Sequence, residues 1–318
     1  MNPLRVAVVG AGAFGRNHVR VLNECAQAQL AGVVDVVPER AAASAAQFGC
    51  PAYANHADLI GKVDAAIVAV PTSAHAEVGC DLMEAGIDVL VEKPIAPDRE
   101  SAQRLIDTAE RCGRILMIGH LERFNPAVMA LQKIARHPLF FEVHRMSLFS
   151  PRSLDIDVVL DLMIHDLDII LDLVGCAPDE VRAAGISILS GKVDIANVRL
   201  AFPTGCIANL TASRVSTERI RKLRLFQPSQ YISLDYSRQE AAAFAVQEGQ
   251  KIDFQMLPVE KNEPLKVEVS HFLECVASRR VPAVSGAHGL RALDAALSIL
   301  AKIEEHAQLV GRQLKSLP

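Results

Sequence analysis

The stretch Arg5-Val6-Ala7-Val8-Val9-Gly10-Ala11-Gly12-Ala13-Phe14-Gly15, residues 5–15, decides the fold of this chain. It joins a run of apolar residues to the spacing G-x-G-x-x-G, and a helical pattern follows over His18 to Gln27. In such a unit the first glycine permits a tight turn, the second lets the backbone approach a pyrophosphate, and the third lets the helix pack closely on the strand. The pattern predicts a dinucleotide site. A glycine-rich turn without a ligand is the alternative.

Asp35 ends the next predicted strand, Leu30 to Val34, and lies twenty residues after Gly15. A carboxylate at this position accepts hydrogen bonds from a ribose 2′-hydroxyl and repels a 2′-phosphate. The sequence therefore favours NAD as the cofactor. Arg40 lies nearby, so NADP stays an alternative.

Short apolar runs alternate with helical stretches through the rest of the N-terminal part. The runs are Ala65 to Val70, Val89 to Val91 and Ile115 to Ile118. Continuous apolar strands separated by helices are typical of a parallel sheet that is covered on both faces. We therefore predict a doubly wound α/β Rossmann domain over residues 1–123.

After about residue 124 the pattern changes. A very apolar helix is predicted over Val158 to Val174, followed by consecutive extended runs and by closing helices over 265–279 and 287–306. The extended runs cover 181–186, 194–202, 206–212, 219–226 and 231–234. Strands without helices between them indicate a mainly antiparallel sheet, hence an α+β domain over 124–318. A large open sheet face would offer a surface for self-association.

Composition argues against several classes of protein. The 318 residues are 50% hydrophobic and carry a formal net charge of -4, which disfavours a nucleic-acid coat. No apolar stretch is long enough for a membrane span and no cleavage-site pattern follows the N-terminus, so we expect a cytoplasmic protein without membrane partners. The seven cysteines contain no C-x-x-C pair, so we expect neither disulfides nor a metal site.

Two loops with polar residues follow predicted strands, where ligands of an open parallel sheet bind. One runs from Val70-Pro71-Thr72 to His75, and the other is Glu92-Lys93-Pro94. A partly desolvated lysine at that edge can stabilise an alkoxide or take part in proton transfer. A solvated Lys93 paired with Glu92 is the alternative interpretation.

The predicted helix over Val158 to Val174 carries four ionisable residues, Asp161, His165, Asp168 and Asp172. At helical spacing they form one polar stripe on an otherwise apolar helix. Such a stripe predicts a histidine that Asp161 orients for proton exchange with a substrate hydroxyl. A stripe on the solvent-facing side of a surface helix is the alternative.

The chain resembles the Gfo/Idh/MocA oxidoreductases over essentially its whole length. The resemblance is carried by the glycine motif with Asp35, by Glu92-Lys93-Pro94 after Ala85-Gly86, and by four further segments. These are Pro71 to His75, Gly119-His120, Arg123-Phe124-Asn125-Pro126 and Asp161-x-x-x-His165-x-x-Asp168. Many sugar-oxidising members carry a Gly-Gly pair shortly before the last motif, whereas this chain has Val158-Val159-Leu160.

The resemblance implies an NAD-dependent enzyme that oxidises a sugar hydroxyl, with catalytic residues Lys93, Asp161 and His165. It implies substrate contacts from Lys93, Arg123, His165 and Asp168. It also implies a homodimer or homotetramer formed through the open sheet. The cofactor-binding residues predicted from the glycine motif and the resemblance together are Gly10, Gly12, Ala13, Phe14, Gly15, Asp35, Val70, Pro71, Thr72, His75, Glu92 and Asn125.

Three segments are most similar to the branch of the family that oxidises the 3-hydroxyl of UDP-N-acetylglucosamine. They are GHLERFNP, DLMIHDLDI and SRVSTERIRKLRLF. The basic residues Arg214, Arg219, Arg221, Lys222 and Arg224 could bind the diphosphate of such a substrate, or could face water on alternate strand positions. An inositol or other polyol dehydrogenase and a non-catalytic NAD-binding sensor are the alternative functions.

Overall fold

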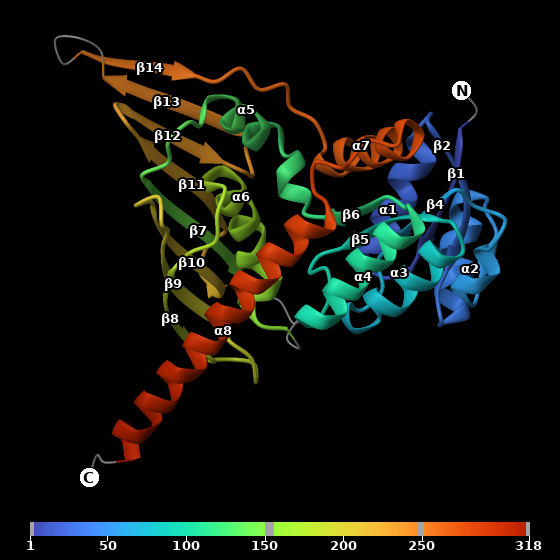
Figure 1. Cartoon of the computed structure of the whole chain (residues 1–318), viewed down its shortest axis with the longest axis horizontal. Coiled ribbons are helices and arrows are strands. Elements are labelled where there is room, and N and C mark those ends of the chain that lie inside the picture. Colours follow the sequence, from blue (N-terminus) through green and yellow to red (C-terminus); the bar gives the residue numbers. More distant parts are fainter. Residues whose placement is uncertain (1–2, 150–155, 247–250, 316–318) are drawn as a thin grey trace. The chain divides into compact units, whose positions relative to one another are not determined.

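The computed structural model describes residues 3–149, 156–246 and 251–315, with side chains described as far as residue 312. The chain forms two compact units. Unit 1 comprises Met1–Phe124 and Asn262–Leu290, and unit 2 comprises Asn125–Lys261 and Arg291–Pro318. Each unit has a sheet of its own (Figure 1).

Unit 1 is built on a six-stranded sheet in the order β3-β2-β1-β4-β5-β6, in which all neighbouring strands are parallel. Its elements are β1 (Leu4–Val9), α1 (Ala13–Glu24), β2 (Ala28–Val34), α2 (Pro38–Phe48), β3 (Ala52–Tyr53), η1 (His56–Leu59), β4 (Ala65–Val68), η2 (Thr72–Ala74), α3 (His75–Glu84), β5 (Asp88–Glu92), α4 (Arg99–Cys112), β6 (Leu116–Gly119), η3 (Leu121–Phe124) and α7 (Pro264–Ser278). The strand β4 and most of β5 are fully buried, as expected for a sheet with helices on both faces. The predicted Rossmann architecture is confirmed.

The glycine turn between β1 and α1 has no room for side chains at two of its three glycines. Gly10 adopts a φ of 103° and a Cβ there would lie 2.4 Å from the Ala69 carbonyl oxygen, while a Cβ on Gly15 would lie 1.7 Å from the Gly10 oxygen. These glycines allow α1 to begin at Ala13, directly after the turn. The helix therefore starts five residues before the predicted His18.

The segment Asn262–Leu290 packs with the N-terminal residues, so unit 1 is not contiguous in sequence. Ser285 forms an antiparallel bridge with Met117 of β6, and the Ile118 N–H donates to the Val284 carbonyl over 3.0 Å. This segment thus extends the outer edge of the parallel sheet. The structure therefore differs from the expected division into residues 1–123 and 124–318, because edge strand β6 finds its second partner late in the chain.

Unit 2 is built on an eight-stranded sheet in the order β14-β13-β12-β11-β7-β10-β9-β8. Only β7 and β10 pair in parallel, so the predicted mainly antiparallel sheet is confirmed. Its elements are α5 (Pro126–Ile134), β7 (Phe140–Leu148), η4 (Val159–Met163), α6 (Ile164–Val174), β8 (Glu180–Ile186), β9 (Ile195–Ala201), β10 (Ile207–Ser216), β11 (Ile220–Gln227), β12 (Gln230–Asp235), β13 (Glu240–Val246), β14 (Ile252–Met256) and α8 (Gly286–Lys315). Residues on alternate strand positions and on α5, α6 and α8 share one core.

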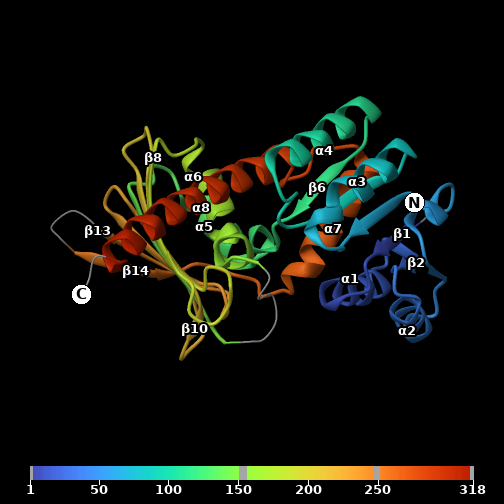
Figure 2. The ribbon, with the colours of Figure 1, turned by 90° about the horizontal axis from the view of Figure 1, so that it is seen from below.

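The helices of unit 2 cover one face of its sheet, as Figures 1 and 2 show for α5, α6 and α8. Phe141, Leu225 and Ile232 point into this core, whereas their neighbours Phe140, Phe226 and Tyr231 point to the opposite face. In the described part of the chain no helix covers that opposite face. The open sheet face expected from the sequence is therefore present.

Three strands of unit 2 were not predicted, namely β7, β13 and β14. Strand β7 is internal to the sheet, but its inward positions are Phe141, Val143 and the fully buried Arg145, so an arginine interrupts the apolar alternation. The predicted single helix over Val158 to Val174 is instead a π-helical turn, η4, followed by the α-helix α6. Among the described residues, no helix has the length and apolar character that a membrane crossing requires.

Candidate active site

A groove of about 670 Å³ lies at the carboxyl edge of the parallel sheet in unit 1. It follows the ends of β1, β2 and β4, the edge at which doubly wound sheets bind their ligands. Seven of the predicted cofactor residues line it: Gly10, Gly12, Ala13, Phe14, Asp35, Val70 and Pro71. The structure therefore brings these seven predicted residues together in one cavity.

Asp35 is oriented by the backbone at the end of β2. Its Oδ2 accepts a hydrogen bond of 2.8 Å from the Ala11 N–H, and its Oδ1 accepts one of 2.8 Å from the Val37 N–H. A carboxylate has about four acceptor positions, so two bonds leave capacity for ribose hydroxyls. Asp35 is 8% exposed and lines the groove, so its charge faces the space where the adenosine ribose of a dinucleotide would bind.

The groove fits the pyrophosphate and ribose of a dinucleotide. A Cβ on Gly12 would meet no atom within 4 Å, so the backbone there borders open space at the N-terminus of α1. That helix end, with its unpaired N–H groups, attracts phosphate. Arg40, whose positive charge would suit the 2′-phosphate of NADP, also lines the groove.

Five predicted cofactor residues are not among those that line the groove: Gly15, Thr72, His75, Glu92 and Asn125. His75 is 1% exposed, with Nδ1 2.9 Å from the Pro94 carbonyl oxygen and Nε2 3.0 Å from that of Val70. Burial lowers the pKa of His75. The side chain therefore ties the loop after β4 to the turn after β5. Asn125 belongs to unit 2.

Lys93 follows β5 and is half-buried within a turn that is held on both sides. The Glu92 carboxylate accepts from His18 Nε2 over 2.7 Å and from the Lys93 N–H over 3.2 Å, while His75 contacts the Pro94 carbonyl. Burial acts to raise the pKa of Glu92, but the His18 hydrogen bond and the Lys93 charge outweigh it and lower that pKa. The turn that presents Lys93 is thus fixed by neighbouring side chains.

His120 follows β6, next to the Lys93 turn at the same sheet edge. It is 1% exposed, and burial together with the charges of Lys93 and Arg123 lowers its pKa to about 3. The imidazole is therefore neutral at physiological pH. Arg123 lies on η3 and is also buried.

Sequence reasoning missed several residues of unit 1. Asn55, His56, Ser73 and Glu77 line the groove, and the first two follow the two-residue strand β3, which is too short to leave a periodic signal. His18 and Glu268 were also missed. His18 is buried on α1 beside Glu92, and only its position three residues after Gly15 on a helix could have indicated that it faces the sheet.

In unit 2, Asp161 lies in the π-helical turn η4 and His165 in the first turn of α6, and both side chains are half-buried. The Ile164 N–H donates to the Val159 carbonyl, an i to i−5 bond that inserts an extra residue in the turn. Such turns are frequent at functional sites. The predicted polar stripe therefore begins in a turn that is wider than an α-helical turn.

The remaining acidic residues of this helix differ in environment. Asp168 is 2% exposed, whereas Asp172 is half-buried and accepts a hydrogen bond of 3.1 Å from Gln132 Nε2. Asp166, which the sequence did not single out, is 1% exposed and takes a bidentate ion pair from Arg145, with distances of 2.6 and 2.9 Å. It also accepts from the Tyr236 hydroxyl over 2.9 Å. The charge of Asp166 is therefore balanced inside unit 2 by Arg145 and Tyr236.

Two further residues of unit 2 have internal partners. Asn125 caps α5, since its Oδ1 accepts from the Ala127 N–H, and its Nδ2 donates to the Tyr236 carbonyl. Arg214 is 6% exposed, donates to the Ile156 and Val193 carbonyls and lies 3.7 Å from Asp194. Arg224 pairs with Glu142 on the open sheet face. These contacts disfavour the interpretation of this basic cluster as a joint diphosphate site.

A Rossmann unit with a groove that fits a dinucleotide, joined to a second unit that bears a histidine beside a π-helical turn, defines an NAD-binding oxidoreductase. Two family models match: "Oxidoreductase family, NAD-binding Rossmann fold" over residues 4–120 and "GFO/IDH/MocA C-terminal domain" over residues 140–226.

The chain is 37% identical to the UDP-N-acetylglucosamine 3-dehydrogenase of Acidithiobacillus ferrooxidans over 96% of this chain and 99% of that protein. A solved structure of that enzyme superimposes with a TM-score of 0.90, with the same coverage of both chains. An inositol 2-dehydrogenase of Rhizobium meliloti is 26% identical over 96% of this chain and 98% of its own. The chain belongs to the Gfo/Idh/MocA family of oxidoreductases, and the resemblance read from its motifs is confirmed.

Proposed function

We propose that this protein is an NAD-dependent dehydrogenase that oxidises the 3-hydroxyl of UDP-N-acetylglucosamine to a 3-keto sugar. The observation that carries the proposal is the similarity to the enzyme of that name over both units, at 37% identity and 96% coverage. The inositol 2-dehydrogenase of Rhizobium meliloti also matches both units, but at 26% identity. The higher identity over the same extent therefore favours a nucleotide sugar over a polyol.

The oxidation removes a hydride and a proton from one secondary alcohol. Bound NAD supplies the hydride acceptor, so the hydrogen on sugar carbon 3 leaves with its electron pair to the nicotinamide. The hydroxyl proton passes to Lys93 or to His165, and the carbon–oxygen bond becomes a ketone. Either side chain suits this role, because both are half-buried and each carries a nitrogen that can take part in general acid–base catalysis.

The other predicted site residues fall into three groups. We propose that Asp161 orients His165, and that Asp168 and Arg123 contact the substrate. Gly12, Phe14 and Asp35 would hold the pyrophosphate and adenosine ribose, which the shape of the groove supports. His75 and Glu92 would act through the Lys93 turn, since both contact it.

The test combines the protein with NAD and UDP-N-acetylglucosamine and follows the absorbance of the reduced cofactor, with the 3-keto product identified by mass spectrometry. Lys93→Ala should lower the rate by at least about a hundredfold. Lys133→Ala, which changes an exposed lysine at the end of α5, is the matched control and should leave the rate unchanged.

A panel of myo-inositol, free sugars and other nucleotide sugars completes the assay. Faster turnover of myo-inositol than of UDP-N-acetylglucosamine would replace the proposed substrate. NAD binding without turnover of any member of the panel would indicate a sensor of the same fold instead of an enzyme.

We further propose that two copies associate through the open sheet face of unit 2. A row of aromatic rings crosses it, Phe140, Phe226, Tyr231, Phe244 and Phe254, with centroids of successive rings 4.8 to 5.7 Å apart. Phe254 is 54% exposed and Ile252 is 74% exposed, and apolar surface of this kind favours burial by a second copy. Light scattering should give a dimer or tetramer, and Phe254→Glu should shift it toward monomer. The cytoplasmic location and the absence of nucleic-acid and membrane partners stay predictions from the sequence.

A further inference from the structure

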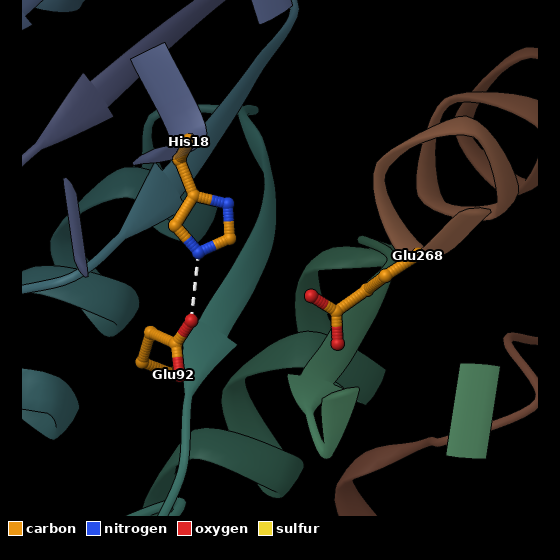
Figure 3. A group of neighbouring side chains, drawn as sticks. All are labelled: His18, Glu92 and Glu268. Carbon is orange, nitrogen blue, oxygen red and sulfur yellow. Dashed lines mark hydrogen bonds and ion pairs between the residues drawn. The ribbon is translucent and has the colours of Figure 1, made fainter. Parts of the chain in front are cut away.

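Three ionisable side chains of unit 1 meet in a buried cluster, of which the predicted site includes only Glu92. They are His18 on α1, Glu92 at the end of β5 and Glu268 on α7, and one oxygen or nitrogen atom of each lies within 4.8 Å of the others. Figure 3 shows the Glu268 carboxyl directed toward the His18–Glu92 pair. His18 and Glu268 are both 0% exposed.

Glu268 is the unusual member of the cluster. Neither of its carboxyl oxygens has a hydrogen-bond partner among the described residues. An isolated carboxylate without water or partner is so costly that such a group keeps its proton instead. Burial, followed by the charge of Glu92, raises the pKa of Glu268 well above its usual value. Glu268 is therefore a neutral acid with one O–H to donate.

Glu92 is the charged member. It accepts from His18 Nε2 and from the Lys93 N–H, so its two oxygens are engaged on different sides. Gly119 leaves it little room, since a Cβ there would lie 3.2 Å from the Glu92 carboxyl carbon. When two carboxyls share a buried space, one ionises and the other holds the proton. Here the ionised one is the residue bonded to the Lys93 backbone.

We propose that His18 and Glu268 are positioning residues that hold the Glu92 carboxylate from two sides and, through its bond to the Lys93 N–H, fix the catalytic lysine. The His18 Nε2–H donates to Glu92 directly. The Glu268 carboxyl faces the same pair, and one oxygen or nitrogen atom of each of the three residues lies within 4.8 Å of the others. The catalytic label of Lys93 rests on the proposed function, whereas the cluster itself does not.

The variants compare a neutral hydrogen-bond donor at position 268 with an apolar side chain. Glu268→Gln keeps the shape and a donor, so it should preserve the arrangement, whereas Glu268→Leu removes the donor and His18→Leu removes the other contact. Glu274→Gln changes an exposed carboxylate on the same helix and is the matched control.

The first readout is the amide NMR signal of Lys93 in the unliganded protein, obtained by selective ¹⁵N-lysine labelling and assigned by its loss in Lys93→Arg. It should move in Glu268→Leu and His18→Leu and stay in place in Glu268→Gln and Glu274→Gln. The second is the infrared band of a protonated carboxyl at neutral pH, which Glu268→Gln should remove. Neither readout requires turnover, so both remain decisive if UDP-N-acetylglucosamine is not the substrate.

The third readout is kinetic. Glu268→Leu should lower kcat about tenfold through misplacement of Lys93 while the Kd for NAD stays unchanged. Glu268→Gln should stay within about twofold of the parent. Equal damage from Gln and Leu, a Lys93 signal insensitive to both, or no infrared band in the parent would overturn the proposal. So would a stoichiometric metal ion, measured by mass spectrometry of the purified protein, that Glu268→Gln removes.

Discussion

Two buried carboxylates of unit 2, Asp166 and Asp194, differ in their surroundings from two of unit 1, Asp35 and Glu268. In unit 2, Asp166 has a bidentate arginine and a tyrosine hydroxyl, and Asp194 accepts from three consecutive backbone N–H groups and from the Ser190 hydroxyl. In unit 1, Asp35 accepts two backbone bonds beside an open groove and Glu268 has no hydrogen-bond partner among the described residues. Carboxylates with complete sets of partners stabilise the fold, whereas those with spare capacity mark places where a ligand or a proton is held.

Two adjacent residues of unit 2, His165 and Asp166, separate a proposed catalytic role from a structural one. His165→Asn should lower kcat by about two to four orders of magnitude, because it removes a group proposed for proton transfer, and should leave the melting temperature unchanged. Steady-state kinetics and thermal melts measure both. Asp172→Asn, later on the same helix, is the control for activity. A His165→Asn variant with full activity would remove His165 from the mechanism.

Asp166→Leu should instead damage folding. It leaves the buried guanidinium of Arg145 without its counter-charge, which typically costs about 3–5 kcal/mol of unfolding free energy. Urea denaturation measures the loss. The double variant Arg145→Met with Asp166→Leu should recover much of it, since replacing both members of a buried pair is far less costly than breaking one. A single variant as stable as the parent would contradict the structural role.

Asp35→Asn tests whether a carboxylate with spare capacity serves a ligand. It should raise the Kd for NAD about tenfold, which corresponds to about 1.4 kcal/mol, and should weaken NADP binding much less, because the repulsion of the 2′-phosphate is lost at the same time. Calorimetric titration with both cofactors gives the ratio. An unchanged NAD to NADP ratio would show that Asp35 only supports the turn.

Asp194→Asn should lower the unfolding free energy by about 1–2 kcal/mol without changing cofactor binding. Burial acts to raise the pKa of Asp194, but the Ser190 hydroxyl and the backbone N–H groups of residues 188–190 outweigh it and lower that pKa. The stabilisation is therefore present above the unfolded value, about 3.9, and is lost as the pH falls toward the folded one. Denaturation curves at several acidic pH values should show this loss in the parent and not in the variant.

The sequence predicted the elements whose signals are local. The glycine turn and Asp35 belong to one βαβ pattern, and the loop after β4 follows another apolar strand. The structure collects them around one groove. The position of Lys93 after an apolar strand placed it at the same sheet edge. The antiparallel strands β8 to β12 followed from consecutive apolar runs.

Long-range features were beyond the reach of sequence patterns. Glu268 joins His18 and Glu92 only because α7 packs in unit 1, 176 residues after Glu92 in the chain. Strand β7 was not predicted because Arg145 occupies one of its inward positions. A buried arginine there is explained only by its partner Asp166, which lies far away in the sequence. The π-helical turn at Asp161 depends on backbone hydrogen bonding, such as the bond from the Ile164 N–H to the Val159 carbonyl, that no side-chain periodicity encodes.

The return of residues 262–290 to unit 1 bears on how the chain is made. During synthesis, N-terminal domains commonly fold while the rest of the chain is still being translated. Here the nascent N-terminal unit would have to wait for α7 and Ser285, the bridge partner of β6, which emerge only after all the strands of the other unit. A ribosome that stalls before residue 262 would leave a Rossmann core with an exposed strand edge, a form suited to capture by chaperones.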